Sequence, residues 1–315
     1  MKSLKTLIKS ELELSDKIEH LPGGDCPGDT VSICEQQIVN AKTLMGLIVD
    51  ALHTLEKDKI VIGIYGGSGS GKSGIASLLS HYLNANHIKT YRMSGDNYPR
   101  RIPQYNDAER VHLFRQSGLQ ELVKQGAYTM ERFEIVQALQ KQNEDSNPKT
   151  IDEHPWMKIY IEGGRKGLKG YLGTAHEQDY REVENILEAF KSGAEKVYMK
   201  RMGREETELW YEDIDMSETQ ILILEWTHAN NDALQGVDLP ILLNSTPAET
   251  LEHRRARNRG DEVDTPFITM VLEIEQNLLD SQAHKAKIIL SKDGDVLDYE
   301  AYLKAMGKEE GNKHE

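Results

Sequence analysis

The sequence predicts an α/β protein in which a mostly parallel five-stranded sheet is flanked by helices. Three observations predict this fold class. Five short strand candidates are spread along the chain, the first of them apolar and β-branched, helical patterns lie between most of them, and a glycine-rich turn joins the first candidate to a helix. Strands that alternate with helices form a parallel sheet with helices on both faces.

Each strand candidate is too short for a typical helix and suits a buried strand. The first, KIVIGIY, ends at the glycine-rich turn, and GIASLLSHYLNAN after the turn has the spacing of a helix. The expected strands are residues 59–65, 89–94, 220–226, 239–245 and 286–292, and the expected helix after the turn is residues 74–86.

A further helix is expected before the first strand, in an N-terminal extension. Ser32 to Glu35 fits the S-x-x-E pattern of a capping box, which marks the start of a helix. The stretch PGGDCPGD just before it is a loop by composition. The apolar residues that follow the box recur at helical spacing; they are Ile33, Ile38, Ala41, Leu44, Met45, Ile48 and Leu52.

Composition bounds the class of protein and its partners. The 315 residues carry a formal net charge of −14, and 38% of them are hydrophobic. This acidic balance argues against nucleic-acid binding, and no apolar run approaches the roughly 18 residues of a membrane span. The first sixteen residues lack the features of a secretory signal. We therefore expect a cytoplasmic protein that binds neither nucleic acid nor membrane, and leave open whether it forms a homodimer.

The two cysteines, Cys26 and Cys34, are eight positions apart. This spacing is not usual for a zinc site. We expect both to be free thiols.

The glycine-rich turn, GGSGSGKS at residues 66–73, fits the pattern G-x-x-x-x-G-K-[ST]. Its glycines let backbone N–H groups point at a phosphate, Lys72 reaches the β- and γ-phosphates, and the Ser73 hydroxyl ligates Mg²⁺. A flexible glycine–serine loop is the alternative, but the flanking strand and helix favour a phosphate loop. ATP and Mg²⁺ are therefore expected at Gly67, Ser68, Gly69, Ser70, Gly71, Lys72, Ser73 and Gly74.

Asp96, in the stretch RMSGDNYPRR, follows the second expected strand. Ligands of open α/β sheets bind at the carboxyl ends of the strands, so Asp96 and the phosphate loop should share one edge. A carboxylate there can accept the proton of a substrate hydroxyl as a phosphoryl group transfers. Glycine, aspartate and asparagine also favour turns, so these three residues alone leave a simple turn open.

Two further segments carry charges suited to phosphate chemistry. The run ILILE ends in Glu225 and has the form of a Walker-B strand, whose acid holds Mg²⁺, although a strand-end glutamate can also face solvent. LEHRRARNRG, residues 251–260, clusters arginines on an expected helix end and loop. Arginine suits phosphate oxygens, and we favour a mobile lid over a solvated basic helix face. These arginines are Arg254, Arg255, Arg257 and Arg259.

Together these segments resemble the uridine kinase and phosphoribulokinase family over about residues 55–300, with gaps. GDNYPRR is similar to its Asp-x-aromatic segment, LPILLNSTPAETLEHRRARNRG to its strand, helix and arginine lid, and AKIIL to its late strand. The resemblance implies a P-loop NTPase fold and an enzyme that moves the γ-phosphoryl of ATP to a hydroxyl of a nucleoside, sugar or sugar phosphate. It implies Asp96 as general base, Glu225 near Mg²⁺, and Lys72 with Arg254 or Arg257 at the phosphates.

The chain departs from that family after Glu225, where Trp226 and Thr227 replace a usual glycine. A weaker resemblance links GGSGSGKS, SGDNYPRRI and DAERVHLFR to adenylylsulfate kinase, although the F-I-S-P-Y-R segment of that family is missing from the sequence. The alternative from another class is a regulatory nucleotide-binding protein without a small acceptor. The sequence lacks the N-K-x-D motif that reads guanine, which argues against a GTP switch.

The expected organisation is an N-terminal extension at 1–55, a P-loop kinase domain at 56–300 and a tail at 301–315. Within the domain, residues 100–215 are polar and irregular and form a substrate-side insertion, and residues 251–264 form the lid. Residues 156–161 alternate in hydrophobicity, which is typical of a half-buried strand. Residues 162–170 are expected to form a loop that is either solvated or binds phosphate. Residues 197–213 are expected to form a hairpin. The candidate substrate residues are Tyr98, Arg100, Arg101, His176, Tyr198, Arg201 and Arg204.

Overall fold

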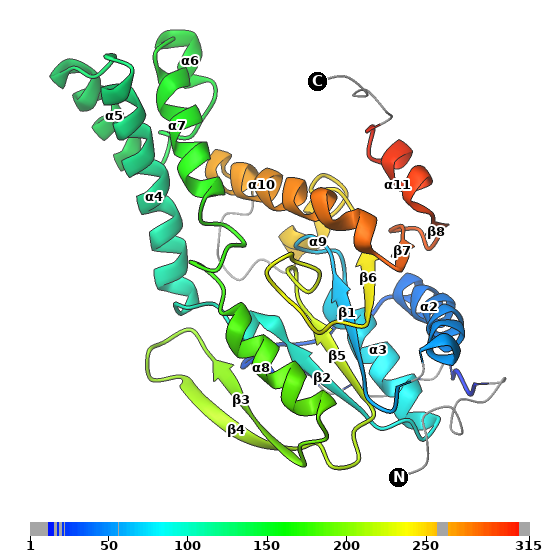
Figure 1. The fold of residues 1–315 in the computed structure, drawn as a ribbon. Coiled ribbons are helices and arrows are strands. Elements are labelled where there is room, and N and C mark those ends of the chain that lie inside the picture. The colour runs from blue at the N-terminus through cyan, green and yellow to red at the C-terminus, as the bar shows by residue number, and fades with distance from the viewer. Residues whose placement is uncertain are drawn as a thin grey trace.

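The main sheet has six strands in the order β2-β5-β1-β6-β7-β8 (Figure 1). The structure is a computed structural model that describes residues 12–15, 18, 21, 23–55, 57–256 and 264–308. Adjacent strands run parallel except β7 and β8, which are antiparallel. The strands are β1 (Ile60–Tyr65), β2 (Thr90–Ser94), β5 (Ile221–Glu225), β6 (Leu239–Leu243), β7 (Ile288–Leu290) and β8 (Val296–Leu297).

The predicted fold class is confirmed, because all five strand candidates are parallel members of this sheet. Alternate side chains of β1 enter two different hydrophobic clusters, so both faces of the sheet are buried. Helices α2 (Glu35–Thr54) and α3 (Lys72–Ala85) cover one face, and α8 (Tyr180–Lys191) and α11 (Tyr299–Ala305) contribute to the cluster on the other (Figure 1). The strand β8 was not predicted because it is only two residues long.

Helix α2 forms as predicted but begins two residues later than the S-x-x-E box implied. Its N-cap is Cys34, whose backbone N–H donates to Oε1 of Gln37 at 3.1 Å. Gln37 is thus the N3 residue of the capping box, the position at which the sequence pattern indicated Glu35. The predicted apolar face is buried at Ala41, Leu44, Met45, Ile48 and Leu52.

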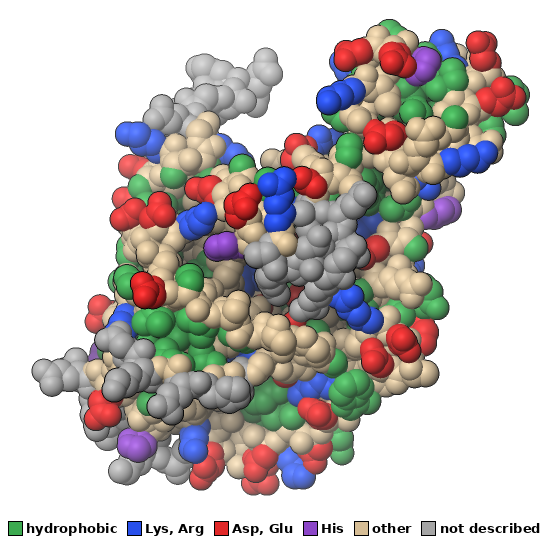
Figure 2. All heavy atoms as spheres, turned by 180° about the vertical axis from the view of Figure 1, so that it is seen from behind, with side chains coloured by type: hydrophobic (Ala, Val, Ile, Leu, Met, Phe, Trp, Pro, Cys, Tyr) green, Lys and Arg blue, Asp and Glu red, His purple; other side chains and the backbone are tan. Residues whose placement is uncertain are grey.

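Residues 100–215 are mainly helical, so the expectation of an irregular insertion is wrong. Helices α4 (Pro103–Lys124), α5 (Met130–Lys141), α6 (Thr150–Glu153) and α7 (Met157–Lys169) form an arm that projects from the sheet (Figure 1). Helix α10 (Pro266–Gln282) shares a hydrophobic cluster with this arm. Figure 2 shows the arm standing out from the body, with charged side chains of both signs over its tip.

The predictions for residues 156–161 and 162–170 are both wrong, because this stretch lies in α7. Its buried side chains recur at helical spacing and include Met157, Tyr160 and Leu168. Six alternating residues are too few to separate a strand period from a helical one.

The glycines of α7 serve helix packing and form neither a phosphate-binding nor a solvated loop. A Cβ on Gly164 would lie 2.5 Å from ring carbons of Phe114 in α4, and a Cβ on Gly163 would overlap Glu121. The same holds for a glycine of α4, because a Cβ on Gly118 would lie 2.7 Å from the ring of Tyr160 in α7. The missing side chains let the two backbones approach closely.

The remaining elements include the predicted hairpin, which pairs β3 (Lys196–Met202) with β4 (Leu209–Asp215) in a separate antiparallel sheet.

Both cysteines are free thiols, as predicted. The end of the predicted tail lies outside the described residues, and the domain boundaries stay predictions. The short elements are η1 (Gly95–Asn97), α9 (Leu251–Ala256) and η2 (Ala283–Lys285).

The loop at residues 23–29 is anchored by a buried carboxylate that the sequence reasoning did not single out. Asp25 accepts hydrogen bonds from the Ser94 N–H at 2.7 Å and the Asn97 amide at 3.2 Å. It also pairs with Arg201 at 3.2 Å. Burial raises the pKa of Asp25 to about 6. This loop is therefore fixed against the carboxyl end of β2.

Candidate active site

The phosphate loop lies between β1 and α3, as the sequence predicts. Gly69 and Gly71 have φ angles of 80° and 88°, a left-handed conformation that glycine adopts without strain. A Cβ on Gly69 would also lie 3.0 Å from the side chain of Arg254. The glycine pattern thus shapes the turn and lets α9 approach it.

Lys72 is the first residue of α3. Its Nζ donates to the carbonyl oxygens of Gly66 and Gly67, at 3.1 and 3.0 Å. These bonds hold the ammonium group over the loop, and Lys72 lines the large cavity described below. This is the position that a phosphate-binding lysine needs.

Ser73 and Glu225 meet at this edge of the sheet. The Ser73 hydroxyl donates to Oε1 of Glu225 at 2.7 Å, while Oε2 of Glu225 is buried without a hydrogen-bond partner among the described atoms. Burial, followed by the nearby charge of Asp96, raises the pKa of Glu225 to about 7, against the opposing effect of Lys72. A hydroxyl and a carboxylate with a spare oxygen fit Mg²⁺, which prefers oxygen ligands and is completed by water and phosphate oxygens.

The described residues contain no group of three or more histidine, cysteine, aspartate or glutamate side chains that could hold a metal ion by themselves. A site built from Ser73, Glu225 and a nucleotide's phosphates does not need such a group.

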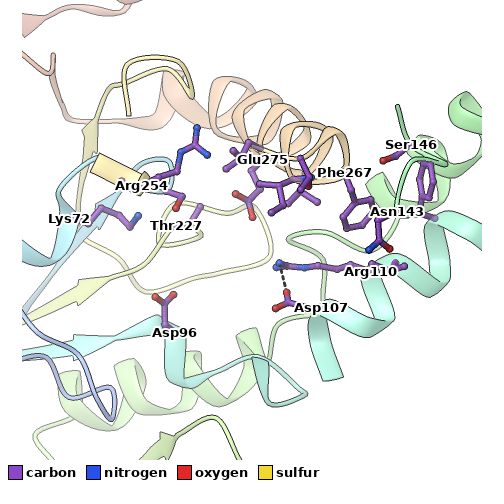
Figure 3. Close-up of a pocket in the computed structure, with 18 of the residues that line it drawn as sticks. Lys72, Asp96, Asp107, Arg110, Asn143, Ser146, Thr227, Arg254, Phe267 and Glu275 are labelled. Atoms are coloured by element: carbon purple, nitrogen blue, oxygen red, sulfur yellow. Dashed lines mark hydrogen bonds and ion pairs between the residues drawn. The ribbon is translucent and has the colours of Figure 1, made fainter. Parts of the chain in front are cut away.

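The G-D-N tripeptide forms the short helix η1, and each residue has a different role. A Cβ on Gly95 would overlap the ring of Trp226, so only glycine fits below that indole. Asn97 is fully buried and accepts a hydrogen bond from the Met202 N–H at 3.0 Å. Asp96, between these two buried residues, is exposed and lines the large cavity. The turn therefore directs one carboxylate toward the phosphate loop (Figure 3).

The arginines of α9 differ in their surroundings. Arg254 lines the large cavity, and its Nη2 donates to the Pro247 carbonyl at 2.8 Å. Arg255 pairs with Glu252 at 3.1 Å and Asp264 at 2.8 Å instead. Arg257 lies outside the described residues. Of the two arginines that are described, only Arg254 reaches the site.

One cavity of about 880 Å³ unites these groups. It begins at the phosphate loop and continues between α4 and α10 toward the loop after α5 (Figure 3). The expected residues Ser68, Gly69, Lys72, Ser73, Asp96, Glu225 and Arg254 all line it, together with Asp107, Arg110, Phe114, Arg115, Asn143, Asp145, Ser146, Thr227, Phe267 and Glu275.

The candidate substrate residues lie elsewhere. Tyr98 is fully buried in the core, and Arg201 is held in an internal network with Asp25 and Glu212. Their large or charged side chains serve packing and ion pairing, and do not line the cavity. The other five are also outside its lining: Arg100 pairs with Asp179, Arg101 and His176 line a second groove, and Tyr198 and Arg204 are exposed.

Sequence reasoning missed the residues of α4 and α10 that line the cavity. Arg110 contacts the fully buried Glu177 at 2.7 Å and Asp107 at 3.2 Å. Glu275 enters from α10, and burial raises its pKa. The helical spacing of Asp107, Arg110 and Phe114 directly after the Asp96 turn was the available signal.

No helix among the described residues is long and apolar enough to cross a membrane.

Parts of this chain are similar to known proteins. In sequence, the chain is 37% identical over 242 residues to the bifunctional alpha-galactosidase/sucrose kinase AgaSK of Mediterraneibacter gnavus. The match covers 77% of this chain but 21% of that protein. Among solved structures, the chain is similar to a possible uridine kinase from Bacillus stearothermophilus. The TM-score is 0.45 and the identity 12%, and the match covers 79% of this chain and 96% of that one. D-glycerate 3-kinase from Cryptococcus neoformans has a TM-score of 0.46 and 12% identity, over 85% of this chain and 99% of that one.

The KAP family P-loop domain matches residues 39–226, which is more than half of the chain. This match spans the phosphate loop, Asp96 and Glu225. The chain therefore belongs to the KAP family of P-loop domains.

Proposed function

We propose that this chain is an ATP- and Mg²⁺-dependent phosphotransferase whose acceptor is a hydroxyl group of a neutral sugar. The observation that carries the proposal is the continuous cavity, which joins the phosphate loop to Asp96 and then to a polar compartment. A protein that only hydrolysed or sensed a nucleotide would have no need of this compartment. The sucrose kinase in the relative's name supports a sugar as the acceptor.

The residues at the loop end would bind the nucleotide. Lys72 and the loop N–H groups would hold the phosphates, and Ser73 with Glu225 would hold Mg²⁺. The metal, when bound, would offset charge on the β- and γ-phosphates. Arg254 would add a planar cation at the same end of the cavity.

Asp96 would act on the acceptor. Its carboxylate would accept the proton of the sugar hydroxyl as that oxygen forms a bond to the γ-phosphorus. The bond between the γ-phosphorus and the bridging oxygen would break, and ADP would leave with its electron pair. The helical arm and α10 would exclude water, which competes as an acceptor.

The charges of the compartment favour a neutral sugar over a sugar phosphate. Its two arginines are already paired, Arg110 with Glu177 and Arg115 with Asp145. Glu275 adds a further carboxyl group to the lining. A second phosphate would therefore meet carboxylates, with no unpaired arginine among the described residues of that compartment to offset its charge.

The test is the rate of ADP formation from Mg·ATP with separate panels of neutral sugars, sugar phosphates, nucleosides and adenylylsulfate, against a blank without acceptor. The proposal predicts that neutral sugars raise the rate far above the blank. If another panel does so instead, the proposed acceptor is wrong. A flat response from a protein shown to bind ATP would contradict the kinase itself and favour a nucleotide switch.

A further inference from the structure

The end of the cavity farthest from the phosphate loop is lined by polar side chains. It lies away from the residues to which we assign phosphoryl transfer. We call it the distal pocket and define it by Phe114, Arg115, Asn143, Asp145, Ser146 and Phe267. Figure 3 shows Asn143 and Ser146 at the opposite end of the cavity from Lys72 and Asp96.

A fixed carboxylate forms the base of the distal pocket. Asp145 is 3% exposed and receives two hydrogen bonds from Arg115, from Nε to Oδ2 and from Nη2 to Oδ1, both at 3.1 Å. The Tyr160 hydroxyl donates to Oδ2 at 2.9 Å. An ionised carboxylate offers about four acceptor positions, so one remains for a ligand hydroxyl.

Ser146 carries the second observation. Its residue is 3% exposed, and its Oγ is buried and has no hydrogen-bond partner among the described atoms. A buried hydroxyl without a partner costs about 1–3 kcal/mol, so such groups are rare unless a ligand or water completes them. Because Ser146 lines the cavity, a hydroxyl of a bound ligand can supply the missing hydrogen bond.

Asn143 extends the polar rim. It adopts a left-handed conformation with φ of 57°, which few residues other than glycine and asparagine tolerate. Its Oδ1 accepts a hydrogen bond from Nη2 of Arg115 at 3.3 Å, which fixes the orientation of the amide. The amide hydrogens add donors beside the acceptors of Asp145.

An apolar wall faces these polar groups. The rings of Phe114 and Phe267 meet edge to face, with centroids 5.7 Å apart. A sugar ring presents hydroxyls along its edge and C–H groups on its faces. The distal pocket offers partners for both.

The length of the cavity sets the size of the acceptor. Asp107 and Arg115 both line it and are eight residues apart on α4. At a rise of 1.5 Å per residue, this wall alone extends about 12 Å. A single sugar ring placed at Asp96 would leave the distal pocket empty.

We propose that the distal pocket binds the second ring of a neutral two-ring sugar whose first ring lies at Asp96. This inference rests on the proposed function and adds the size of the acceptor and the residues that select it. The Asp145 carboxylate and the Ser146 hydroxyl bind hydroxyls of that second ring.

The experiment compares sucrose with its two component monosaccharides as acceptors, in the wild type and in the variants Ser146→Ala and Asn143→Gly. Glycine keeps the left-handed backbone at position 143, and alanine at 146 removes only an unpaired hydroxyl, so both variants should fold. Each should lower kcat/KM for the two-ring sugar by about tenfold more than for a single-ring sugar, the effect of one lost hydrogen bond. Ser192→Ala, at an exposed serine of the main body, is the matched control and should change neither.

Calorimetric binding of sucrose in the absence of ATP provides a second measurement, and Ser146→Ala should weaken it by a similar factor. Equal losses for both sizes of sugar, or no loss in either variant, would overturn the distal pocket while leaving a sugar kinase intact. If the wild type phosphorylates a single-ring neutral sugar but not sucrose, the distal pocket is overturned alone; if it phosphorylates no neutral sugar of the panel, the proposed function fails as well. These outcomes separate the two proposals.

Discussion

Ser73 at the start of α3 and Glu225 at the end of β5 are joined by a 2.7 Å hydrogen bond across 152 residues of sequence. The parallel pairing of β1 with β5 sets this contact, because it brings the phosphate loop and the acid to the same edge. Oε2 of Glu225 is buried without a hydrogen-bond partner among the described atoms, so it would be available as a ligand of a nucleotide's metal.

Replacing Glu225 by glutamine removes the carboxylate and keeps the shape of the side chain. We expect Glu225→Gln to lower the rate of phosphoryl transfer about 10²-fold or more and to raise the Mg²⁺ concentration needed for half-maximal rate. A magnesium titration of ADP formation measures both. Glu218→Gln, at an exposed glutamate before β5, is the control. An unchanged magnesium requirement would argue against Glu225 as a ligand.

Arg254 and Arg255 are a matched pair of neighbours with different surroundings. Because Arg254 lines the cavity and Arg255 pairs with Glu252 and Asp264, Arg254→Ala should lower kcat by about 10²-fold and Arg255→Ala by far less. Steady-state kinetics with the best acceptor measures the difference. Equal losses would show that the arginines act only through the general charge of α9.

The glycines between α4 and α7 predict a stability effect. In Gly164→Ala the new Cβ would lie 2.5 Å from the ring of Phe114, and we expect a loss of about 1–3 kcal/mol in the free energy of unfolding. Gly46→Ala in α2 has no atom within 4 Å of the new Cβ and should raise that free energy by about 0.5–1 kcal/mol. Urea unfolding compares the two. Changes of the same sign would refute the packing role assigned to Gly164.

Asp25 predicts a pH dependence of stability. Its pKa is raised by burial from 3.8 to about 6, so between these values the folded protein holds a proton that the unfolded chain releases. Its contribution is therefore fully present below pH 3.8 and is lost as the pH rises through about 6. Relative to Asp25→Asn, the wild type should lose about 2 kcal/mol of unfolding free energy between pH 4 and pH 7.

Urea unfolding at both pH values, followed by circular dichroism, tests the Asp25 prediction. The exposed Asp58→Asn variant should keep the profile of the wild type. Parallel profiles for the wild type and Asp25→Asn would contradict the prediction.

Much of the catalytic end of the cavity was predictable because its signals are local. The phosphate loop occupies residues 66–73, Asp96 follows a short strand candidate, and Glu225 ends a short apolar run. A parallel sheet brings such strand ends to one edge whatever separates them in sequence. The five parallel strands and the positions of these residues could therefore be derived from pattern alone.

Beyond the helical spacing of Asp107, Arg110 and Phe114, the acceptor end could not be predicted, because tertiary packing creates it. Glu275 from α10, Arg110 from α4 and Ser146 from the loop after α5 meet only once the arm is folded. The glycines at 163, 164 and 167 looked like a loop because their packing partners in α4 lie about 40–50 residues away in sequence. Tyr98 and Arg201 looked like substrate contacts by analogy, but they anchor the core and the hairpin instead.

The central claim is that Asp96 activates an acceptor hydroxyl. The most direct measurement is phosphoryl transfer to the best sugar by Asp96→Asn, with the dissociation constant of ATP measured on the same protein and Asp58→Asn as control. We expect transfer to fall by about 10²–10⁴-fold while ATP affinity stays within a few-fold of the wild type. An Asp96→Asn protein that transfers phosphate at the wild-type rate would contradict it.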